Sequence, residues 1–158
     1  MFKEIKDFLN KEDLLNIKNL YMNKEFSHWR LIEYQEGIED QEFLMHDLYW
    51  NFNIVSPFWK TTLPLINKLN VNALVQARVN CMLKKDKHYR SSFHTDTPFE
   101  CGTAIYYLNT TNGWTEFETG EKVKTEENKL IIFNSSQKHA AVHQTDEQKR
   151  YVININFF

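Results

Sequence analysis

The chain has 158 residues, of which 42% are hydrophobic, which is enough for one globular domain with a buried core. Its 19 basic and 21 acidic side chains give a formal net charge of -2, so there is no electrostatic basis for sequence-independent binding of nucleic acid. No apolar stretch reaches the length of a membrane span, no signal segment follows Met1, and two cysteines are too few for a disulfide framework. We therefore expect a single domain over residues 1–158 in a reducing, cytoplasmic setting.

The first part of the chain, about residues 1–70, shows the periodicity of helices. The predicted helices cover about residues 2–9, 11–21 and 56–70. Asn10 is a good N-cap for the second of them, with Asp13 three residues later. Pro64 argues for a break in the third helix or for a late beginning.

From Asn72 onward the pattern changes to short β-branched or aromatic runs separated by turn residues. These runs are "NALVQARVNCML", "GTAIYYLN", "WTEFET", "KLIIFN" and "RYVININFF". Asn112-Gly113 is the strongest short signal for a hairpin, and "FETGEKV" and "KTEENKL" predict two further turns. Several strands without helices between them predict an antiparallel sandwich or barrel over about residues 72–158. The predicted fold class is therefore α+β, with a mainly β core and N-terminal supporting helices.

The stretch "FHTDT" suggests a metal site. His94 and Asp96 lie two positions apart in a run that reads as strand, where residues i and i+2 point to the same face. A metal needs at least one more ligand, and His139 and His143 lie just before the last strand. Two histidines and one carboxylate form the facial triad of non-haem Fe(II) oxygenases. The same ligands also suit zinc, so they do not fix the metal by themselves.

The last predicted strand opens with a cation. Arg150, Asn154 and Asn156 share one face of it, which suits a polar pocket and not an apolar core. A guanidinium binds a carboxylate through two parallel hydrogen bonds. A dicarboxylic cosubstrate would therefore have one end on the metal and the other on Arg150.

These features together resemble the 2-oxoglutarate- and Fe(II)-dependent dioxygenases, and within them the prolyl 4-hydroxylase-like branch in its small phage and bacterial members. The resemblance rests on four elements in order, which are His-x-Asp, the strand "IYYLN", a distal His, and an Arg that opens the last strand. It covers roughly residues 72–158 and extends more loosely to "IKDFLNKEDLLNIKNL". It implies a double-stranded β-helix, a distorted jelly roll of about eight strands. It also implies Fe(II), 2-oxoglutarate and O2 as cofactors, ascorbate as a reductant, and the cytoplasm of a bacterium or of a phage-infected cell.

The resemblance assigns the iron ligands to His94, Asp96 and His139. His139 is preferred to His143 because it follows Phe133 by six residues and precedes Arg150 by eleven, as in the family.

The same resemblance gives the cosubstrate contacts. Arg150 would bind the far carboxylate of 2-oxoglutarate, and Tyr107 would add a hydrogen bond to it. Asn80 and Asn154 are the expected pocket amides. The chain departs from the family at Met82, where a tyrosine is common, and "NGWTEF" replaces the Gly-Gly-Glu-Thr run of many prolyl hydroxylases.

The implied activity is hydroxylation of a peptidyl proline, or of another C–H bond in a peptide or small molecule, with release of succinate and CO2. Two alternatives remain. One is a non-catalytic jelly-roll module that binds a metal or ligand, and the other is an oxygenase that acts on a nucleic-acid base. The complete set of His94, Asp96, His139 and Arg150 favours the enzyme, and the near-neutral charge argues against the nucleic-acid substrate.

Overall fold

The structure is a computed structural model that describes residues 1–32 and 42–158. Its larger sheet is built from β1 (Lys3–Ile5), β2 (Arg30–Ile32), β3 (Phe43–Trp50), β4 (Asn53–Ile54), β5 (Leu74–Leu83), β6 (Gly102–Tyr107), β9 (Lys129–Asn134) and β11 (Lys149–Phe157). Its smaller sheet is built from β7 (Trp114–Phe117), β8 (Lys122–Lys124) and β10 (His139–Val142). The two helices are α1 (Lys11–Tyr21) and α2 (Trp59–Leu69).

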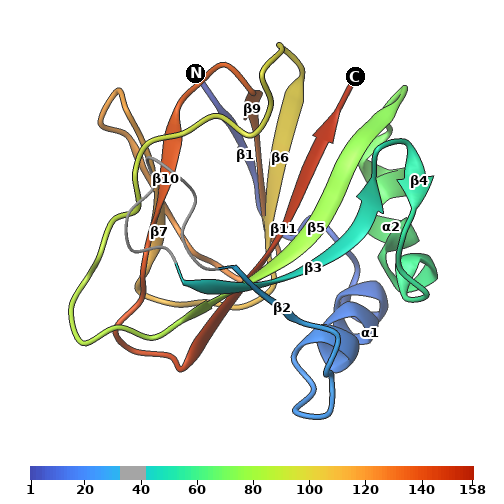
Figure 1. The fold of residues 1–158 in the computed structure, drawn as a ribbon, viewed down its shortest axis with the longest axis horizontal. Helices are drawn as coiled ribbons and strands as arrows, with labels where there is room; N and C mark the ends of the chain where they lie inside the picture. The colour runs from blue at the N-terminus through green and yellow to red at the C-terminus, as the bar shows by residue number, and fades with distance from the viewer. Residues whose placement is uncertain (33–41) are drawn as a thin grey trace.

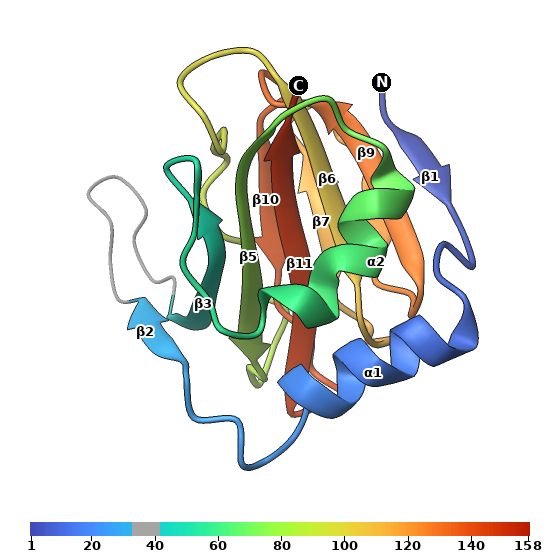
Figure 2. The ribbon, with the colours of Figure 1, turned by 90° about the vertical axis from the view of Figure 1, so that its right-hand side faces the viewer.

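All strand pairs are antiparallel. The larger sheet has the order β1-β9-β6-β11-β5-β3-β2, with β4 paired to β3, and the smaller sheet has the order β10-β7-β8. The two sheets lie opposite one another, and both helices cover the outer face of the larger sheet (Figures 1 and 2). This is the double-stranded β-helix with supporting helices that the sequence predicts.

The strand β11 separates two apolar layers. Tyr151, Ile153 and Ile155 belong to the core between the larger sheet and the helices. Val152 belongs to the smaller cluster between the two sheets, where it joins residues such as Phe117 of β7. Successive side chains of a strand point to opposite faces, so the other positions of β11, including Arg150, face the space between the sheets.

The two helices form where the sequence places them. The Asn10 side chain caps α1 by accepting a hydrogen bond from the backbone N–H of Asp13 at 2.9 Å. Pro64 lies inside α2 without breaking it, because buried neighbours such as Leu65 and Ile66 hold this face of the helix on the sheet. Among the described residues, no helix is both long and apolar enough to cross a membrane.

The predicted helix over residues 2–9 is wrong. Residues Lys3–Ile5 form β1, which pairs with the edge of β9, and Phe2 stacks on Phe117 at 4.9 Å between ring centroids. Asp7 then has a φ of 50°, which ends any regular structure before α1. The apolar spacing of this segment is used for contacts with distant strands and not for a helix.

The expectation that about residues 1–70 are helical also needs correction. Between the two helices lie β2, β3 and β4, and β3 alone contributes eight residues to the larger sheet. The partner of β3 in this sheet is β5, about 30 residues further along the chain. Local periodicity does not reveal a pairing of this kind.

The predicted hairpin at Asn112-Gly113 does not form. The strands on its two sides, β6 and β7, belong to different sheets, and neither residue has the positive φ that a type I′ turn requires. Asn112 instead forms hydrogen bonds with Thr145 and Asp146 in the loop before β11. The turn in "FETGEKV" is confirmed, because β7 and β8 pair across it and Gly120 has a φ of 99°.

Candidate active site

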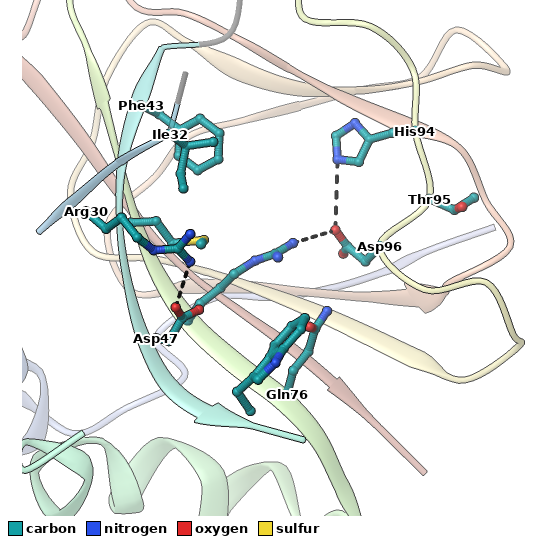
Figure 3. A pocket seen from close by; sticks show the side chains of 11 residues that line it. Arg30, Ile32, Phe43, Asp47, Gln76, His94, Thr95 and Asp96 are labelled. Atoms are coloured by element: carbon teal, nitrogen blue, oxygen red, sulfur yellow. Dashed lines mark hydrogen bonds and ion pairs between the residues drawn. The ribbon is translucent and has the colours of Figure 1, made fainter. Parts of the chain in front are cut away.

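His94, Asp96 and His139 meet at one end of the space between the sheets. One ligand atom from each lies within 4.8 Å of the others. Nε2 of His94 is 3.9 Å from Oδ1 of Asp96, and Nε2 of His139 is 3.8 Å from Oδ2 of the same carboxylate. Figure 3 shows the imidazole of His94 directed at Asp96. The cluster consists of two histidines and one carboxylate, which is the donor set of a facial triad.

A backbone contact brings the two histidines together. His94 and His139 form an isolated antiparallel bridge, with N–H to carbonyl distances of 3.0 Å in both directions. The segment around "FHTDT" is otherwise irregular, so the expected strand through His94 and Asp96 is wrong. Its only other bridge joins Arg90 to Val142, and the segment therefore crosses β10 at two points without forming a continuous ladder.

The ring orientation of each histidine is fixed by a carbonyl two residues earlier. Nδ1 of His94 lies 3.1 Å from the carbonyl oxygen of Ser92, and Nδ1 of His139 lies 3.3 Å from that of Gln137. A carbonyl only accepts, so Nδ1 carries the proton in both rings. Each Nε2 then presents a lone pair toward the cluster, which is the tautomer that a metal requires.

Asp96 is completely buried, yet it stays charged. Burial alone would raise its pKa, but the charge of Arg78, with further contributions from His139, His94 and Asn154, holds the pKa of Asp96 below its ordinary value. Arg78 Nη2 donates to Oδ1 at 3.0 Å, and Asn154 Nδ2 donates to Oδ2 at 3.1 Å. Burial also lowers the pKa of His139, although Asp96 opposes this. The charged carboxylate and neutral imidazole are the forms that bind metals.

A cavity extends from this cluster into the space between the sheets, and we call it the inner cavity. Its lining residues are Phe43, Arg78, Asn80, Met82, His94, Ile105, Thr115, His139, Ala140, Ala141, His143, Arg150, Val152 and Asn154. The sequence predicts that Asn80, Arg150 and Asn154 share a pocket with the metal site, and the structure brings all three into the inner cavity.

Arg150 is a buried cation without an acidic partner. Its side chain is 1% exposed. Its Nη1 donates to the carbonyl oxygens of Val142 at 3.2 Å and Trp114 at 3.3 Å, and its Nη2 donates to the hydroxyl of Thr115 at 3.3 Å. Its Nε has no acceptor, and no acid among residues 1–32 and 42–158 forms an ion pair with it. An unpaired buried charge is costly, so this guanidinium fits a ligand that brings a carboxylate.

Tyr107 lies behind Arg150, outside the lining of the inner cavity. It is completely buried, and its ring centroid is 5.7 Å from the guanidinium carbon. Its hydroxyl forms a 2.8 Å hydrogen bond with that of Thr115, which does line the cavity. The tyrosine is therefore placed to support Arg150 and Thr115, and it does not line the cavity in which the resemblance implies a direct contact with the cosubstrate.

His143 and the two amides also lie where the sequence predicts a pocket. His143 is buried in the inner cavity, but its Nδ1 donates to the Leu83 carbonyl at 3.0 Å and it is not part of the cluster. Oδ1 of Asn80 and Oδ1 of Asn154 are buried without partners. Unsatisfied polar atoms of this kind are typical of a site that a ligand or water completes.

Two residues that line the inner cavity, Arg78 and Thr115, are not predicted as site residues from the sequence. Arg78 holds the Asp96 carboxylate and lines the inner cavity, and its signal was a charge on the same strand face as Asn80. Thr115 connects Arg150 to Tyr107. It lies at the start of β7, in the other sheet, and no local pattern marks it.

The model of one protein family matches the second half of the chain. This is the 2OG-Fe(II) oxygenase superfamily, and the match covers residues 77–158, which include every residue of the cluster and of the pocket described above except Phe43. No curated protein matches the chain.

Several solved structures share the fold at low sequence identity. A prolyl hydroxylase from Trichoplax adhaerens, in complex with a peptide fragment of the hypoxia inducible factor oxygen degradation domain, has a TM-score of 0.72 at 14% identity, covering 99% of this chain and 83% of its own. A 2OG-Fe(II) oxygenase family oxidoreductase from Burkholderia pseudomallei has a TM-score of 0.73 at 11% identity, covering 99% and 84%. A prolyl-4-hydroxylase from Pseudomonas putida has a TM-score of 0.70 at 12% identity, covering 99% and 91%.

Proposed function

Because the chain belongs to the 2OG-Fe(II) oxygenase superfamily, whose members use Fe(II), 2-oxoglutarate and O2, we propose that it hydroxylates a C–H bond in a peptide or small molecule. Peptidyl proline is the first acceptor to test, since two of the similar structures are prolyl hydroxylases. The reaction would convert the acceptor, 2-oxoglutarate and O2 into the hydroxylated acceptor, succinate and CO2.

We assign the metal ligands to His94, Asp96 and His139. The two Nε2 lone pairs and the charged carboxylate converge there, and the Nδ1 hydrogen bonds keep both rings in the required tautomer. Bound Fe(II) supplies the centre for O2 activation and oxidative decarboxylation of the keto acid. The chain's own contribution is to hold these side chains in place and to limit access of water to the space between the sheets.

The observation that carries this proposal is the unpaired guanidinium of Arg150. It lies in the same cavity as the triad, it is fully buried, and its Nε–H has no acceptor. The far carboxylate of 2-oxoglutarate would neutralise it and accept that hydrogen bond. Thr115 would orient the guanidinium from the opposite side, with Tyr107 behind it.

The first test is succinate release from 2-oxoglutarate in the presence of Fe(II) and ascorbate, without an acceptor. We expect turnover by the wild type and none by Asp96→Ala. Arg150→Met should weaken 2-oxoglutarate binding by about 100-fold or more, as expected for truncation of one partner of a buried charge pair. Lys60→Met, an exposed position on α2, is the matched control and should behave as wild type.

Binding of 2-oxoglutarate to the metal-loaded protein should be measured alongside turnover. If the wild type neither binds 2-oxoglutarate nor releases succinate, the oxygenase proposal is wrong, and a non-catalytic binding module takes its place. The choice of acceptor is tested separately, with proline-containing peptides and mass spectrometry. A gain of one oxygen atom on proline would support prolyl hydroxylation. Turnover without an acceptor would support only the broader proposal, that the protein is a 2-oxoglutarate-dependent oxygenase.

A further inference from the structure

A second cavity, of about 540 Å³, opens on the other side of the triad, and we call it the outer cleft. Its walls come from β2, β3 and β5, and from residues 94–96. It shares only Phe43, Arg78 and His94 with the inner cavity, so the two cavities meet at the metal site. Figure 3 shows His94 and Asp96 on one side of the outer cleft and Arg30 and Asp47 on the other. A group bound there would be next to the metal without occupying the place of the cosubstrate.

Arg78 lies at the junction of the two cavities. In the larger sheet it is the register partner of Asp47 on β3 and of Asn154 on β11. Directly opposite residues of antiparallel strands have their side chains on the same face, so the three form a polar row across the sheet. The side chain of Arg78 is 21% exposed, and its charge therefore reaches the outer cleft.

The charged groups of the outer cleft have hydrogen-bond donors to spare. Its two carboxylates are already engaged, since Asp96 accepts from Arg78 at 3.0 Å and Asp47 accepts from Arg30 at 2.8 Å. Each guanidinium has five N–H donors, and Nε of Arg78 is buried with no acceptor among the described residues. The unused N–H donors of Arg30 and Arg78 therefore suit a ligand that accepts hydrogen bonds.

The sum of charges in the site with metal and 2-oxoglutarate bound also favours an anionic ligand. Arg30, Arg78, Arg150 and a metal dication together carry five positive charges, with the histidines neutral. Asp47, Asp96 and the two carboxylates of 2-oxoglutarate carry four negative charges. A metal bound to Asp96 also weakens the attraction between that carboxylate and Arg78. Among the charged groups of the described residues that line the two cavities, one positive charge is therefore left without a counter-ion.

We propose that the outer cleft binds the acceptor and that the acceptor carries a carboxylate, which Arg78 receives. This inference rests on the proposed oxygenase function and narrows its substrate class. The apolar part of the acceptor would lie against the hydrophobic wall formed by Ile32, Phe43, Met45 and Trp50. A free amino acid, the C-terminus of a peptide and an acidic side chain all supply this chemistry.

The test is a binding comparison that does not require the natural substrate. The protein is loaded with Zn(II), which is redox-inert, and saturated with 2-oxoglutarate, and the probes are phenylacetate and its neutral analogue phenylacetamide. We expect phenylacetate to bind the wild type at least about ten-fold more tightly, the ratio of one charge-assisted hydrogen bond, and to shift the Arg78 Nε–H signal in NMR spectra. Equal binding of the two probes, or binding of neither, overturns the proposal.

Variants assign the preference to a residue. Arg78→Met should remove the preference for phenylacetate, Arg78→Lys should keep part of it, and Lys60→Met should leave it unchanged. Because Arg78 also holds Asp96, folding and zinc content of each variant are checked first. Should Arg78→Met not fold, the wild-type comparison and Arg78→Lys still decide. A folded, zinc-loaded Arg78→Met that keeps the full preference would contradict the assignment.

The two proposals fail in different ways. A wild type that releases succinate but binds both probes equally refutes only the carboxylate inference, whereas a wild type that does not bind 2-oxoglutarate refutes the function beneath it. Once the preference is established, free amino acids, peptides with a free C-terminus, and amidated peptides with one internal glutamate separate the three sources by their stimulation of succinate release. Equal stimulation by an amidated peptide without acidic residues would overturn the proposal.

Discussion

The roles of His139 and His143 differ although the two residues are four positions apart. His139 begins β10 and is bridged to His94, so its Nε2 reaches Asp96. His143 follows the end of β10, where its Nδ1 is bonded to the Leu83 carbonyl. Their spacing from neighbouring motifs favours His139 as the ligand, and the backbone bridge to His94 supports the same choice. Strand parity is no guide, since both positions have the same parity.

We predict that His139→Ala and His143→Ala separate metal binding from stability. Substitution of a residue that supports a metal ligand typically weakens metal binding by about 10- to 100-fold. His139→Ala removes a ligand itself, so it should weaken metal binding by more than this. His143→Ala should keep a metal stoichiometry of one and lose only some stability, since it removes a buried hydrogen bond. Titration calorimetry with Co(II) measures both affinities. Loss of metal binding in His143→Ala alone would reverse our assignment.

At the scale of elements, the end of β10 links the loop at Gly113 to the inner cavity. The Val142 carbonyl accepts a hydrogen bond from Arg150 at 3.2 Å. Gly113 packs against this same carbonyl, and a Cβ added there would be 2.7 Å from its oxygen. The dipeptide Asn112-Gly113, which the sequence marks as a hairpin turn, is therefore needed for close approach of two backbones.

We predict that Gly113→Ala disturbs Arg150 from a distance. The new methyl group must displace the Val142 carbonyl, which should cost about 1–3 kcal/mol of unfolding free energy and weaken 2-oxoglutarate binding several-fold. Gly120→Ala is the matched control, because Gly120 has a φ of 99° but nothing within 4 Å of an added Cβ. The control should lose stability through its backbone alone and keep its affinity. Urea unfolding and ligand titration give the two quantities.

The elements that the sequence predicts are those with a local signal. The strands β5, β6, β7, β9 and β11 follow from β-branched and aromatic runs, and α1 follows from its cap and apolar stripe. The strands β1 and β3 are missed because their partners β9 and β5 lie far along the chain, and β2 is missed because it has only three residues. The same limit explains the site. His94, Asp96 and Arg150 carry motif signals, whereas Thr115 acquires its role only when the two sheets face each other.

At the scale of the whole molecule, a further buried histidine lies on the far side of the larger sheet from the candidate site. His46 of β3 belongs to an aromatic group with Phe26 and Phe58. Its Nδ1–H donates to the His28 carbonyl at 2.8 Å, and its Nε2 accepts from the Ser56 hydroxyl at 2.8 Å. Burial lowers the pKa of His46 below its ordinary value, although the bond to His28 opposes this.

We predict that this histidine makes the fold sensitive to mild acid. Because the folded-state pKa of His46 is depressed, the unfolded chain binds a proton more readily than the folded chain does. The free energy of unfolding should therefore fall as the pH falls below about 6.5, the ordinary pKa of histidine. Urea unfolding between pH 8 and pH 5 measures this dependence. His46→Gln, which does not titrate, should reduce this dependence but not remove it, because burial also lowers the pKa of His139 and of His143. An unchanged slope would exclude His46 as a cause.

The position of β11 in the larger sheet has a consequence for how the chain is made. The sheet consists of two halves, β1-β9-β6 and β5-β3-β2, and β11 alone joins them. On the ribosome both halves are synthesised before β11, yet neither has its central neighbour until Lys149–Phe157 emerge. The same residues bring Arg150 and Asn154. The larger sheet and the inner cavity are therefore completed in the same step of biosynthesis, and a nascent chain that stalls before β11 has neither.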